Sequence, residues 1–502
     1  MTSLWQQTAP MIPADTFDPG GFDGGRHDTI VVGAGLTGLV AAVLLARAGQ
    51  RVSVLEARAT GALTTGNTIG KLSLLQGTLL GELRERAGDD VLCAYVEANR
   101  EGQAWLAREL RSRGETLEHR TAFTYASDRS QLPLLERERE AAAVAGLALA
   151  ESRTEELPFD TFGALTLDAQ IQLHPLRVLA ILADELSERQ GRLIEHCPVV
   201  DIERCHDGLR IVTERGPIAA DACVLATGTP ILDCGRFFAK LQPIRSFVAA
   251  YRLPAAEVPR GMYLAAGPPQ HSLRGARDDD GREVLIVGGA GRVTGRFEDT
   301  REELRSLDSW TAHRFPNSQR FTWWAAQDYR SRTRIPFAGA VPRGGGRIYA
   351  ATGYNRWGMT NAVASALAIV SQLLGGDMAW ASRMRERAQR LIDLSEAARA
   401  NAAVAERLVT SWTTAELRPI DEVPTPAEGE GIVVRDGIDP IGIARVDGAL
   451  YRVSAVCPHL GGILRWNRAE LSWDCPLHGS RFAADGGRLE GPALRDLPQR
   501  TP

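Results

Sequence analysis

Apolar and polar residues follow two different patterns along the chain. Up to about residue 409, short apolar runs are separated by longer segments whose apolar residues recur at helical spacing. This pattern predicts buried strands joined by amphipathic helices. Beyond Pro419, Pro424 and Pro426, short alternating runs are separated by Asp-Gly turns, which predicts antiparallel strands. We therefore expect an α/β (α+β) part followed by a smaller all-β part.

The predicted elements divide the chain into four segments. Helical spacing occurs at 79–113, at 136–151, from 175 onward and at 384–409. Strand patterns occur at 192–195, 209–213, 222–225, 244–253 and 283–287. The resulting division is an irregular N-terminal arm at 1–27, a main part at 28–400, a helix end and Pro-rich linker at 401–427, and the all-β part at 428–502.

The stretch from Thr29 to Glu56 has the pattern strand, glycine turn, helix, strand, acid. In its turn, Gly33 permits a tight bend, Gly35 lets the backbone approach a pyrophosphate, and Gly38 lets the helix pack closely on the strand. The helix N-terminus offers free N–H groups to phosphates, and Glu56 can accept hydrogen bonds from ribose hydroxyls. This combination predicts a dinucleotide site.

A second strand, turn and helix follow at 347–370. Gly353 and Gly358 bracket an aromatic and basic tip that runs from Tyr354 to Trp357, and the helix begins near Met359. In a flavin enzyme, such a helix N-terminus stabilises negative charge on the flavin. By contrast, the glycines at 285–295 do not predict a second dinucleotide site. The sixth motif position is Thr294, and no second strand ending in an acid follows.

The segment from Gly61 to Gly77 joins the dinucleotide motif to the first long helix. It is rich in glycines, small residues and hydroxyls. Such a composition suggests backbone held close to a flat ligand.

Length and charge limit the classes of function. A chain of 502 residues is too long for one core, so two or three domains are expected. A formal net charge of −4 gives no reason to expect nucleic acid or an anionic membrane as partner. The sequence shows no apolar run of transmembrane length and no secretory signal pattern, which predicts a soluble cytoplasmic protein. Of the seven cysteines, five are expected to be reduced thiols.

The other two cysteines belong to paired metal-ligand motifs. Cys457 and His459 form a Cys-x-His pair, and Cys475 and His478 form a Cys-x-x-His pair. Two cysteines and two histidines match a Rieske [2Fe–2S] centre, in which the cysteines hold one iron and the histidines the other. The competing interpretation is a structural Cys2His2 zinc site. The Cys-x-His spacing and the glycines and prolines beside each pair favour the iron–sulfur cluster.

Three segments of the main part carry a family resemblance: VVGAGLTGL at 31–39, VLATGTP at 224–230 and ATGYNRWGMT at 351–360. Through them, residues 28–400 resemble the FAD-dependent oxidoreductases of the D-amino-acid oxidase and glycine oxidase superfamily. The resemblance implies a Rossmann-like FAD-binding domain with a mixed-sheet substrate domain. The FAD-binding positions it implies are Gly33, Gly35, Leu36, Thr37, Gly38, Glu56, Ala57, Arg58, Thr65, Thr68, Lys71, Leu72, Val200, Thr227, Gly228, Gly353, Gly358, Met359 and Thr360.

Shorter motifs point to a bacterial subgroup with a C-terminal iron–sulfur module. They are GNTIGKL at 66–72, Gln327-Asp328 and WGMT at 357–360. Asn67 and Arg292 each stand where histidine would be expected, which sets this chain apart from the subgroup.

Residues 426–502 resemble Rieske ferredoxin modules. Gly462 and Leu477 stand where the respiratory type has two further cysteines, so that disulfide cannot form. Ser480 retains a hydroxyl donor, but Phe482 replaces a tyrosine. With fewer donors, the reduction potential is expected in the lower part of the Rieske range of about −150 to +300 mV.

A flavin site combined with a one-electron cluster predicts an FAD-dependent dehydrogenase or oxidase. We expect an amine or amino-acid-like substrate to transfer hydride to FAD, with electrons relayed through the intrachain cluster to an external acceptor. Tyr354, Arg356 and Trp357 are the candidate catalytic residues: the two rings would wall the site. Arg356, with Arg332 and Arg334, is also a candidate to bind a substrate carboxylate.

Three alternatives need different features. An electron-transfer reductase linking a nicotinamide or ferredoxin partner, FAD and the cluster needs a nucleotide site that the 285–295 segment does not supply. A complete Rieske oxygenase needs a mononuclear iron held by two histidines and a carboxylate, and the remaining histidines include no pair at close helical spacing. A redox sensor without turnover is the third alternative.

Overall fold

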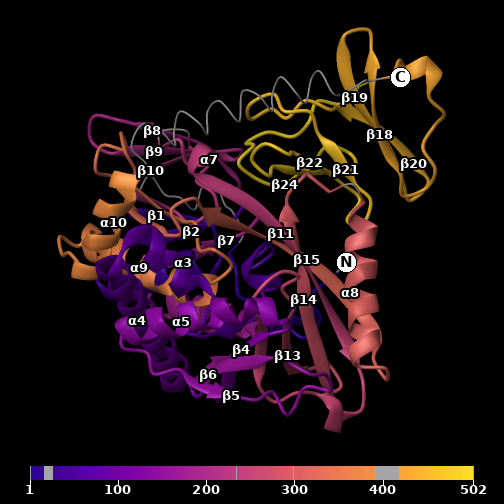
Figure 1. The fold of residues 1–502 in the computed structure, drawn as a ribbon. Coiled ribbons are helices and arrows are strands. Elements are labelled where there is room, and N and C mark those ends of the chain that lie inside the picture. Colours follow the sequence, from indigo (N-terminus) through magenta and orange to yellow (C-terminus); the bar gives the residue numbers. More distant parts are fainter. Residues whose placement is uncertain (1, 16–25, 233–234, 298, 392–417, 501–502) are drawn as a thin grey trace.

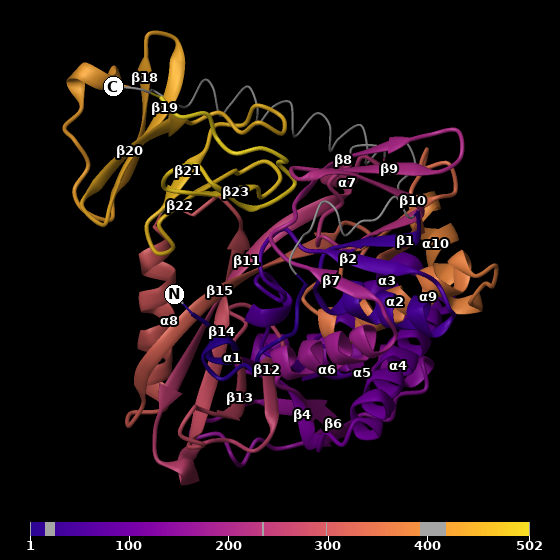
Figure 2. The ribbon, with the colours of Figure 1, turned by 180° about the vertical axis from the view of Figure 1, so that it is seen from behind.

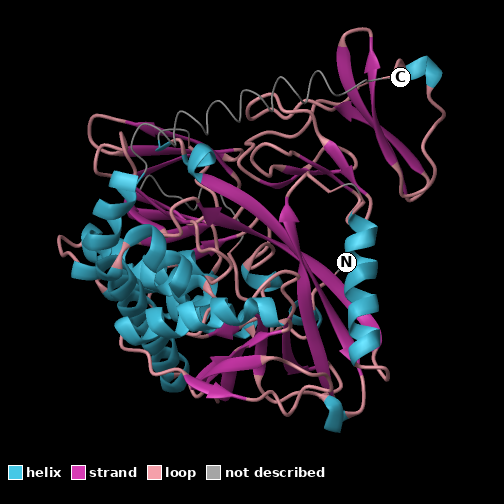
Figure 3. Cartoon of the chain, viewed as in Figure 1, coloured by secondary structure: helices cyan, strands magenta, loops and turns pink. Residues whose placement is uncertain are grey.

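The computed structural model describes residues 2–15, 26–232, 235–297, 299–391 and 418–500 (Figure 1). Most helices gather on one side of the molecule, and Thr300–Arg314 (α8) lies on the opposite side (Figures 1 and 3). The C-terminal part consists almost entirely of strands and loops. Within the described ranges, every helix is too short or too polar to cross a bilayer. The α/β part with a C-terminal all-β part, predicted from the sequence, is thus confirmed.

The first sheet is mainly parallel and carries both glycine turns. Its strand order is β16-β17-β10-β1-β2-β7, and the β8–β9 hairpin extends it beside β10. The pairs from β17 to β7 are parallel, and the helix Leu36–Arg47 (α2) makes the crossover from β1 to β2. The strands are His27–Val32 (β1), Val52–Leu55 (β2), Arg192–Ile194 (β7), Val199–Arg204 (β8), Leu209–Thr213 (β9), Gly216–Leu225 (β10), Phe337–Ala340 (β16) and Ile348–Thr352 (β17).

The second sheet is mixed and lies beside the first. Its order is β15-β11-β14-β13-β12-β4-β6-β3, with β5 on β6, and only the β12–β4 pair is parallel. The strands are Lys71–Leu72 (β3), Glu118–Ala126 (β4), Ala150–Ser152 (β5), Gly163–Gln172 (β6), Leu241–Arg252 (β11), Met262–Ala265 (β12), Ser272–Arg277 (β13), Glu283–Val293 (β14) and Gln319–Ser331 (β15). The 285–295 segment is therefore a strand and turn, as its sequence predicted.

Ten helices of the described residues surround the two sheets. α2 packs between α9 and α6 over the first sheet, and α8 packs on β14 and β11 of the second (Figure 2). Their bounds are Leu4–Gln7 (α1), Leu36–Arg47 (α2), Leu79–Ala87 (α3), Asp89–Ser112 (α4), Leu132–Val144 (α5), Pro175–Glu188 (α6), Phe237–Lys240 (α7), Thr300–Arg314 (α8), Gly358–Leu373 (α9) and Ala379–Leu391 (α10).

Three predicted helices differ from the observed ones. The segment 79–113 forms two helices, because Gly88 takes a φ of +88° between them. The segment 136–151 begins earlier, at Leu132, and its end becomes strand β5. The segment 384–409 coincides with α10 up to residue 391, and its remainder, like most of the linker 401–427, lies outside the described residues.

Residues 2–15 of the N-terminal arm include a short helix, α1, that the sequence analysis did not predict. α1 is closed by a capping box at Ser3, whose hydroxyl also donates to Gly66 O at 2.7 Å. The indole of Trp5 is buried and donates to Thr68 O at 2.6 Å. A four-residue helix is too short to show a hydrophobic period, so periodicity did not predict this support of the 61–77 segment.

The C-terminal part contains two antiparallel sheets. β18-β19-β20 form one and β21-β22-β23-β24 the other. Trp473 and Phe482 are fully buried in its core, together with Cys457 and Cys475. The strands are Gly431–Asp436 (β18), Asp439–Val446 (β19), Ala449–Ser454 (β20), Arg465–Asn467 (β21), Ser472–Asp474 (β22), Arg481–Ala483 (β23) and Arg488–Glu490 (β24).

Candidate functional site

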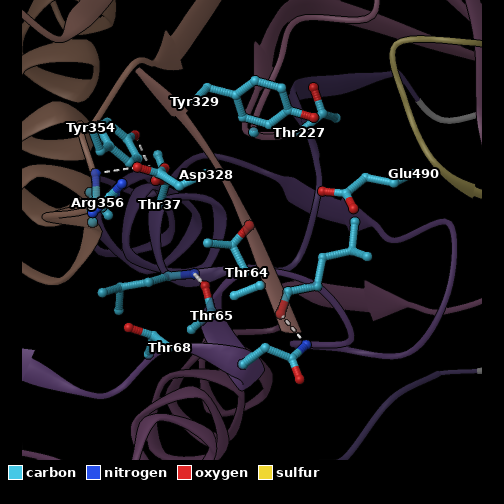
Figure 4. Close-up of a pocket in the computed structure, with 18 of the residues that line it drawn as sticks. Thr37, Thr64, Thr65, Thr68, Thr227, Asp328, Tyr329, Tyr354, Arg356 and Glu490 are labelled. Atoms are coloured by element: carbon cyan, nitrogen blue, oxygen red, sulfur yellow. Dashed lines mark hydrogen bonds between the residues drawn. The ribbon is translucent and has the colours of Figure 1, made fainter. Parts of the chain in front are cut away.

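A cavity of about 420 Å³ lies where the two sheets and the C-terminal part meet (Figure 4). The carboxyl ends of β1 and β2 and the turns that follow β10 and β17 all contribute to its lining. Parallel strands present their carboxyl ends at one sheet edge, and ligands of open α/β sheets bind there. The cavity therefore occupies the position expected for a dinucleotide.

The turn after β1 has the close packing that its glycines predicted. Gly33 takes a φ of +105°, and a Cβ there would lie 2.6 Å from Ala226 O. A Cβ on Gly38 would lie 1.9 Å from Gly33 O, so the start of α2 requires glycine. Gly35 is the N-cap of α2 and lines the cavity, which brings the positive end of that helix to the ligand space.

Glu56 follows β2 and lines the same cavity. Its carboxylate accepts hydrogen bonds from Ala34 N at 2.8 Å and Arg58 N at 2.9 Å. Burial raises the pKa of this carboxyl, and the two backbone donors oppose that rise. Glu56 is thus held at the end of β2, the position from which the acid of a dinucleotide-binding motif contacts the ribose.

Most predicted FAD-binding positions line the cavity, and four do not. Gly38 packs α2 against the turn instead of reaching the ligand space. The side chain of Leu72 enters the core, because it alternates with Lys71 on β3. Val199 lines the cavity in place of Val200, and the hydroxyl of Thr360 donates to Asn99 Oδ1. The structure therefore places these four residues outside the cavity lining.

Charged side chains gather at one end of the cavity. Asp328, Arg330, Arg334 and Arg356 all line it. Arg334 is paired with Glu82, with Nε 2.6 Å from Oε2. Burial and the neighbouring charges of Arg356 and Arg334 lower the pKa of Arg330 to about 10. Among the described residues, no carboxylate lies within ion-pair distance of the Arg330 guanidinium, so this cation is available to an anionic ligand.

The arginines predicted to bind a substrate carboxylate differ in whether they line the cavity. Arg356 reaches the cavity, and its Nη1 donates to Gln270 Oε1 at 3.1 Å. Its backbone N–H donates to Asp328, whose pKa burial raises to about 6. Arg332 points away and donates to Ala239 O at 3.0 Å, so it is excluded from this role.

The predicted aromatic wall and the buried lysine are both present. Trp357 and Tyr354 line the cavity, and the Tyr354 hydroxyl lies 2.8 Å from Thr37 Oγ1. Lys71 donates from Nζ to Tyr263 O at 2.8 Å and to Ser272 Oγ at 2.7 Å. Burial holds the pKa of this amine well below its usual range.

The four predicted metal ligands come together in the C-terminal part. Two loops present them, one closed by Cys457 N donating to Gly462 O and the other by Cys475 N donating to Ser480 O. The rings of His459 and His478 lie 5.0 Å apart and are nearly perpendicular. Cys457 and Cys475 are buried in the C-terminal core, and the two histidine rings lie side by side at its edge.

Three observations test whether these residues fit a two-iron cluster. Both ring nitrogens of His478 are buried and have no hydrogen-bond partner among the described residues, as expected of a ligand position. Burial lowers the pKa of His478 to about 3, which keeps the ring neutral for metal binding. Within the described chain, no three of the four donor atoms lie within 4.8 Å of one another, as ligands of a single zinc would. The donor set fits a cluster with two metal positions.

The sequence profile of the FAD dependent oxidoreductase family (DAO) matches residues 28–372, and that of the Rieske [2Fe-2S] domain matches residues 414–501. The chain belongs to the FAD-dependent oxidoreductase family. Its main part binds FAD, and its C-terminal Rieske domain binds a [2Fe–2S] cluster. The protein is an oxidoreductase.

Among proteins of known sequence, one relative extends over nearly the whole chain. The Bacillus subtilis (strain 168) protein YhfW, which carries the name of a Rieske 2Fe-2S iron-sulfur protein, is 26% identical over 482 residues, 94% of this chain and 93% of its own length. The cytochrome b6-f complex iron-sulfur subunit of Synechococcus sp. (strain JA-3-3Ab) is 46% identical over 61 residues, 12% of this chain and 36% of that subunit.

Solved structures share the fold of the flavin part. L-proline dehydrogenase from P. horikoshii has a TM-score of 0.61 at 17% identity and covers 72% of this chain and 98% of its own. Glycine oxidase from Geobacillus kaustophilus has a TM-score of 0.59 at 18% identity and covers 70% and 96%. L-amino acid deaminase from Proteus vulgaris has a TM-score of 0.58 at 14% identity and covers 74% and 97%.

The Rieske domain forms part of the flavin cavity in this oxidoreductase. Residues 488–491, 493 and 494 line the cavity together with the flavin part. The segment is held by Arg58 Nη1, which donates to Leu489 O at 3.3 Å, and by Ala493 N, which donates to Ser480 Oγ at 3.0 Å. The sequence motifs gave no signal for this contribution, because none of these residues belongs to a ligand or glycine motif.

The cluster loops also contact the flavin part directly. Gln327 Nε2 donates to Gly479 O and to the Tyr329 hydroxyl, both at 2.9 Å, and Tyr329 lines the cavity. The ring of Phe238 on α7 lies 5.6 Å from that of His459 and 5.1 Å from that of His478. The two histidine ligands therefore face the flavin part of the same chain.

Two departures from the Rieske pattern are packed into the fold. A Cβ on Gly462 would lie 2.7 Å from Leu477 Cδ1, so the two positions face each other without thiols. Phe482 is fully buried in the Rieske core. Of the two positions that depart from the flavin subgroup, Asn67 donates to Ala62 O and Leu63 O, and Arg292 pairs with Glu303.

Proposed function

We propose that this protein oxidises an amine or amino-acid-like substrate at the FAD and passes the electrons one at a time through its Rieske cluster to an external acceptor. The FAD, when bound, accepts a hydride, and the cluster carries single electrons. The protein's own residues would bind the substrate, orient it, exclude water and keep the two cofactors close together.

The observation that carries the substrate class is the unpaired Arg330 guanidinium in the cavity. A partly buried arginine that has no carboxylate partner among the described residues is well suited to a bidentate contact with a substrate carboxylate. Arg356 lines the same cavity and can add a second donor, because its guanidinium donates to the neutral side chain of Gln270. The structural neighbours named as acting on amino acids support this choice, although their low identities show only the fold.

Asp328 gives the same corner a negative charge. It lines the cavity, and its neighbour Arg330 would hold the substrate carboxylate. A substrate that carries both an ammonium and a carboxylate group would match the two charges. The aromatic rings of Tyr354 and Trp357 would cover the apolar part of such a substrate and exclude water.

The relay is supported by the direct contacts between the Rieske domain and the cavity wall. Tyr329 lines the cavity, Gln327 bonds to it, and Gly479 beside His478 accepts from the same amide. Electrons would therefore cross a packed and hydrogen-bonded boundary within one chain.

Anaerobic bleaching of the flavin tests the substrate class. The holoprotein would be mixed with a panel of amines, amino acids, NADH and NADPH, and flavin absorbance followed. We expect an amino acid or related amine to bleach the flavin and the nicotinamides not to. Rapid bleaching by NADPH or NADH, with none by amines, would replace this proposal with the electron-transfer reductase.

Arg330→Lys should raise the KM for a carboxylated substrate by about tenfold to a hundredfold, because a bidentate contact of about 1.5–3 kcal/mol is lost. Arg332→Lys is the matched control, since Arg332 lies in the same segment but outside the cavity. Equal effects of the two substitutions would remove Arg330 from the substrate site.

A further inference from the structure

A buried ionic network joins the Rieske domain to the flavin part. Arg245 of β11 forms a bidentate pair with Glu470 and lies 3.5 Å from Glu490 Oε2. Arg481 contacts Glu470 at 3.0 Å, Asp474 at 2.9 Å and Glu490 at 3.8 Å. All five side chains are at most 7% exposed. The network thus contains three carboxylates but only two guanidinium groups.

The three carboxylates are not equally satisfied. Glu470 has short contacts to both arginines and accepts from Asn467 Nδ2 at 3.0 Å. Asp474 accepts from Arg481 and from Asn467 and Ser472, all at 2.9 Å. Among the described residues, Glu490 has only the two longer ion-pair contacts, to Arg245 and Arg481, and both use its Oε2. The surplus negative charge of the network is therefore least stabilised on Glu490.

Glu490 is also the carboxylate of this network that lines the flavin cavity. Figure 4 shows its carboxyl group directed into the pocket, on the side of Tyr329 and Thr227. Across the network, Asp474 directly precedes the cluster ligand Cys475 in the chain. Glu490 thus stands between the space for FAD and the surroundings of the cluster.

We propose that Glu490 is the proton acceptor that accompanies electron transfer from the FAD to the Rieske cluster. This inference rests on the proposed function for the source of the electrons. The Glu490 carboxylate would take up one proton and become a carboxylic acid when one electron and one proton leave the bound reduced FAD and the electron goes to the cluster. It would release that proton, and return to the carboxylate, when the external acceptor takes the electron from the cluster.

The physical reason is charge compensation in a buried interface. An added electron is costly where water is excluded and the effective dielectric is low. A proton bound nearby restores the local charge, and Glu490 offers the least paired oxygen for it. Burial raises the pKa of Glu490 to about 7, partly opposed by the attraction of Arg245 and Arg481 and reinforced by Glu470 and Asp474. Tyr329, which also faces it from β15, is held neutral by burial that raises its pKa.

The test measures the reduction potential of the cluster in the holoprotein between pH 6 and pH 8. Reduction at an electrode with mediators needs no substrate, so the result does not depend on the substrate class. In the wild type, we expect the equilibrium constant for reduction to fall with rising pH by up to about tenfold per unit, equivalent to about 59 mV. Glu490→Gln keeps the shape but cannot take the proton, so this dependence should flatten.

Glu430→Gln is the matched control. Glu430 also belongs to the Rieske domain and pairs with Arg301 of the flavin part at 3.0 Å, but it lies outside the cavity. Its substitution should leave the pH dependence unchanged. A Glu490→Gln protein that retains both cofactors and shows the wild-type dependence would overturn the proposal and leave Glu490 a structural ion-pair partner.

A measurement on the wild type covers the case in which Glu490→Gln fails to retain its cluster. The infrared difference spectrum between the oxidised and reduced cluster should show a protonated carboxyl band gained on reduction near pH 7. Its absence would overturn the proposal. Failure of the relay itself has a different signature: the cluster would then not equilibrate with photoreduced FAD in either protein, whatever the pH.

Discussion

The flavin cavity and the cluster site are built in opposite ways. The cavity is lined by segments from Val32 to Leu494, drawn from two sheets and two domains. The cluster ligands come from two loops, 457–462 and 475–480, that belong to one small core. When each loop of a site carries a ligand pair, the spacing of those residues in the sequence predicts the site. When a site is assembled from remote segments, the sequence predicts only the segments that carry a recognisable motif. The ionic network around Arg245 connects the flavin part, which carries the cavity, to the Rieske domain, which carries the cluster ligands.

The largest effect is expected where the two regions are joined. Arg245→Ala would leave Glu470 and Glu490 buried with one compensating arginine, which should destabilise the protein by about 3–5 kcal/mol. Denaturant unfolding followed by cluster absorbance and flavin fluorescence would measure it. Arg468→Ala removes a half-exposed partner of Glu430 at the same interface and should cost less than about 1 kcal/mol. Similar losses in both variants would show that the buried network does not hold the domains together.

An intermediate effect should separate the two sites. In Gly38→Ala the new methyl would meet Gly33 O, so the turn must shift, at a cost of about 1–3 kcal/mol. We expect much lower FAD content after purification and full cluster content, measured by flavin absorbance and acid-labile sulfide. Gly81→Ala, whose Cβ has ordinary contacts at 3.5 Å in α3, should retain its FAD. If Gly38→Ala lost its cluster together with its FAD, the cluster site would depend on the flavin site, which would contradict this account.

The smallest effect concerns pH and stability. The pKa of Glu490 is raised by folding from 4.5 to about 7. A raised carboxyl pKa means that the folded state binds the proton more tightly, so this stabilisation is present below about pH 4.5 and is lost as the pH rises through about 7. Glu490→Gln should therefore gain stability relative to the wild type between pH 5 and pH 8, measured by thermal unfolding. A constant difference across this range would show that Glu490 does not titrate in the folded state.

The sequence predicted those features whose physical requirement is local. Gly33 and Gly38 were predicted because a tight turn and a close helix–strand contact admit no side chain. The Cys-x-His and Cys-x-x-His pairs were predicted because one loop holds each pair. The resemblance implied Val200, whereas its neighbour Val199 lines the cavity, because successive residues of a strand face opposite sides.

Other features depend on segments that meet only in the fold. Arg330 was missed although it lies two residues from Asp328 on β15, a spacing that places both on one face of a strand. Glu490 was missed because its significance comes from Arg245, which is 245 residues away. The excess of carboxylates over arginines cannot be seen until the two domains are docked.

The relay through the cluster is the central claim, and Cys475→Ser tests it most directly. Loss of a thiolate ligand should destroy the cluster, while FAD stays bound through the other domain. Cys205→Ser, at an exposed cysteine far from the ligand motifs, is the control. We predict that substrate still bleaches the flavin of Cys475→Ser in one anaerobic turnover at close to the normal rate, while multiple turnover with a one-electron acceptor collapses. A folded, FAD-containing variant that substrate cannot reduce would contradict the relay and place the cluster in the substrate chemistry itself.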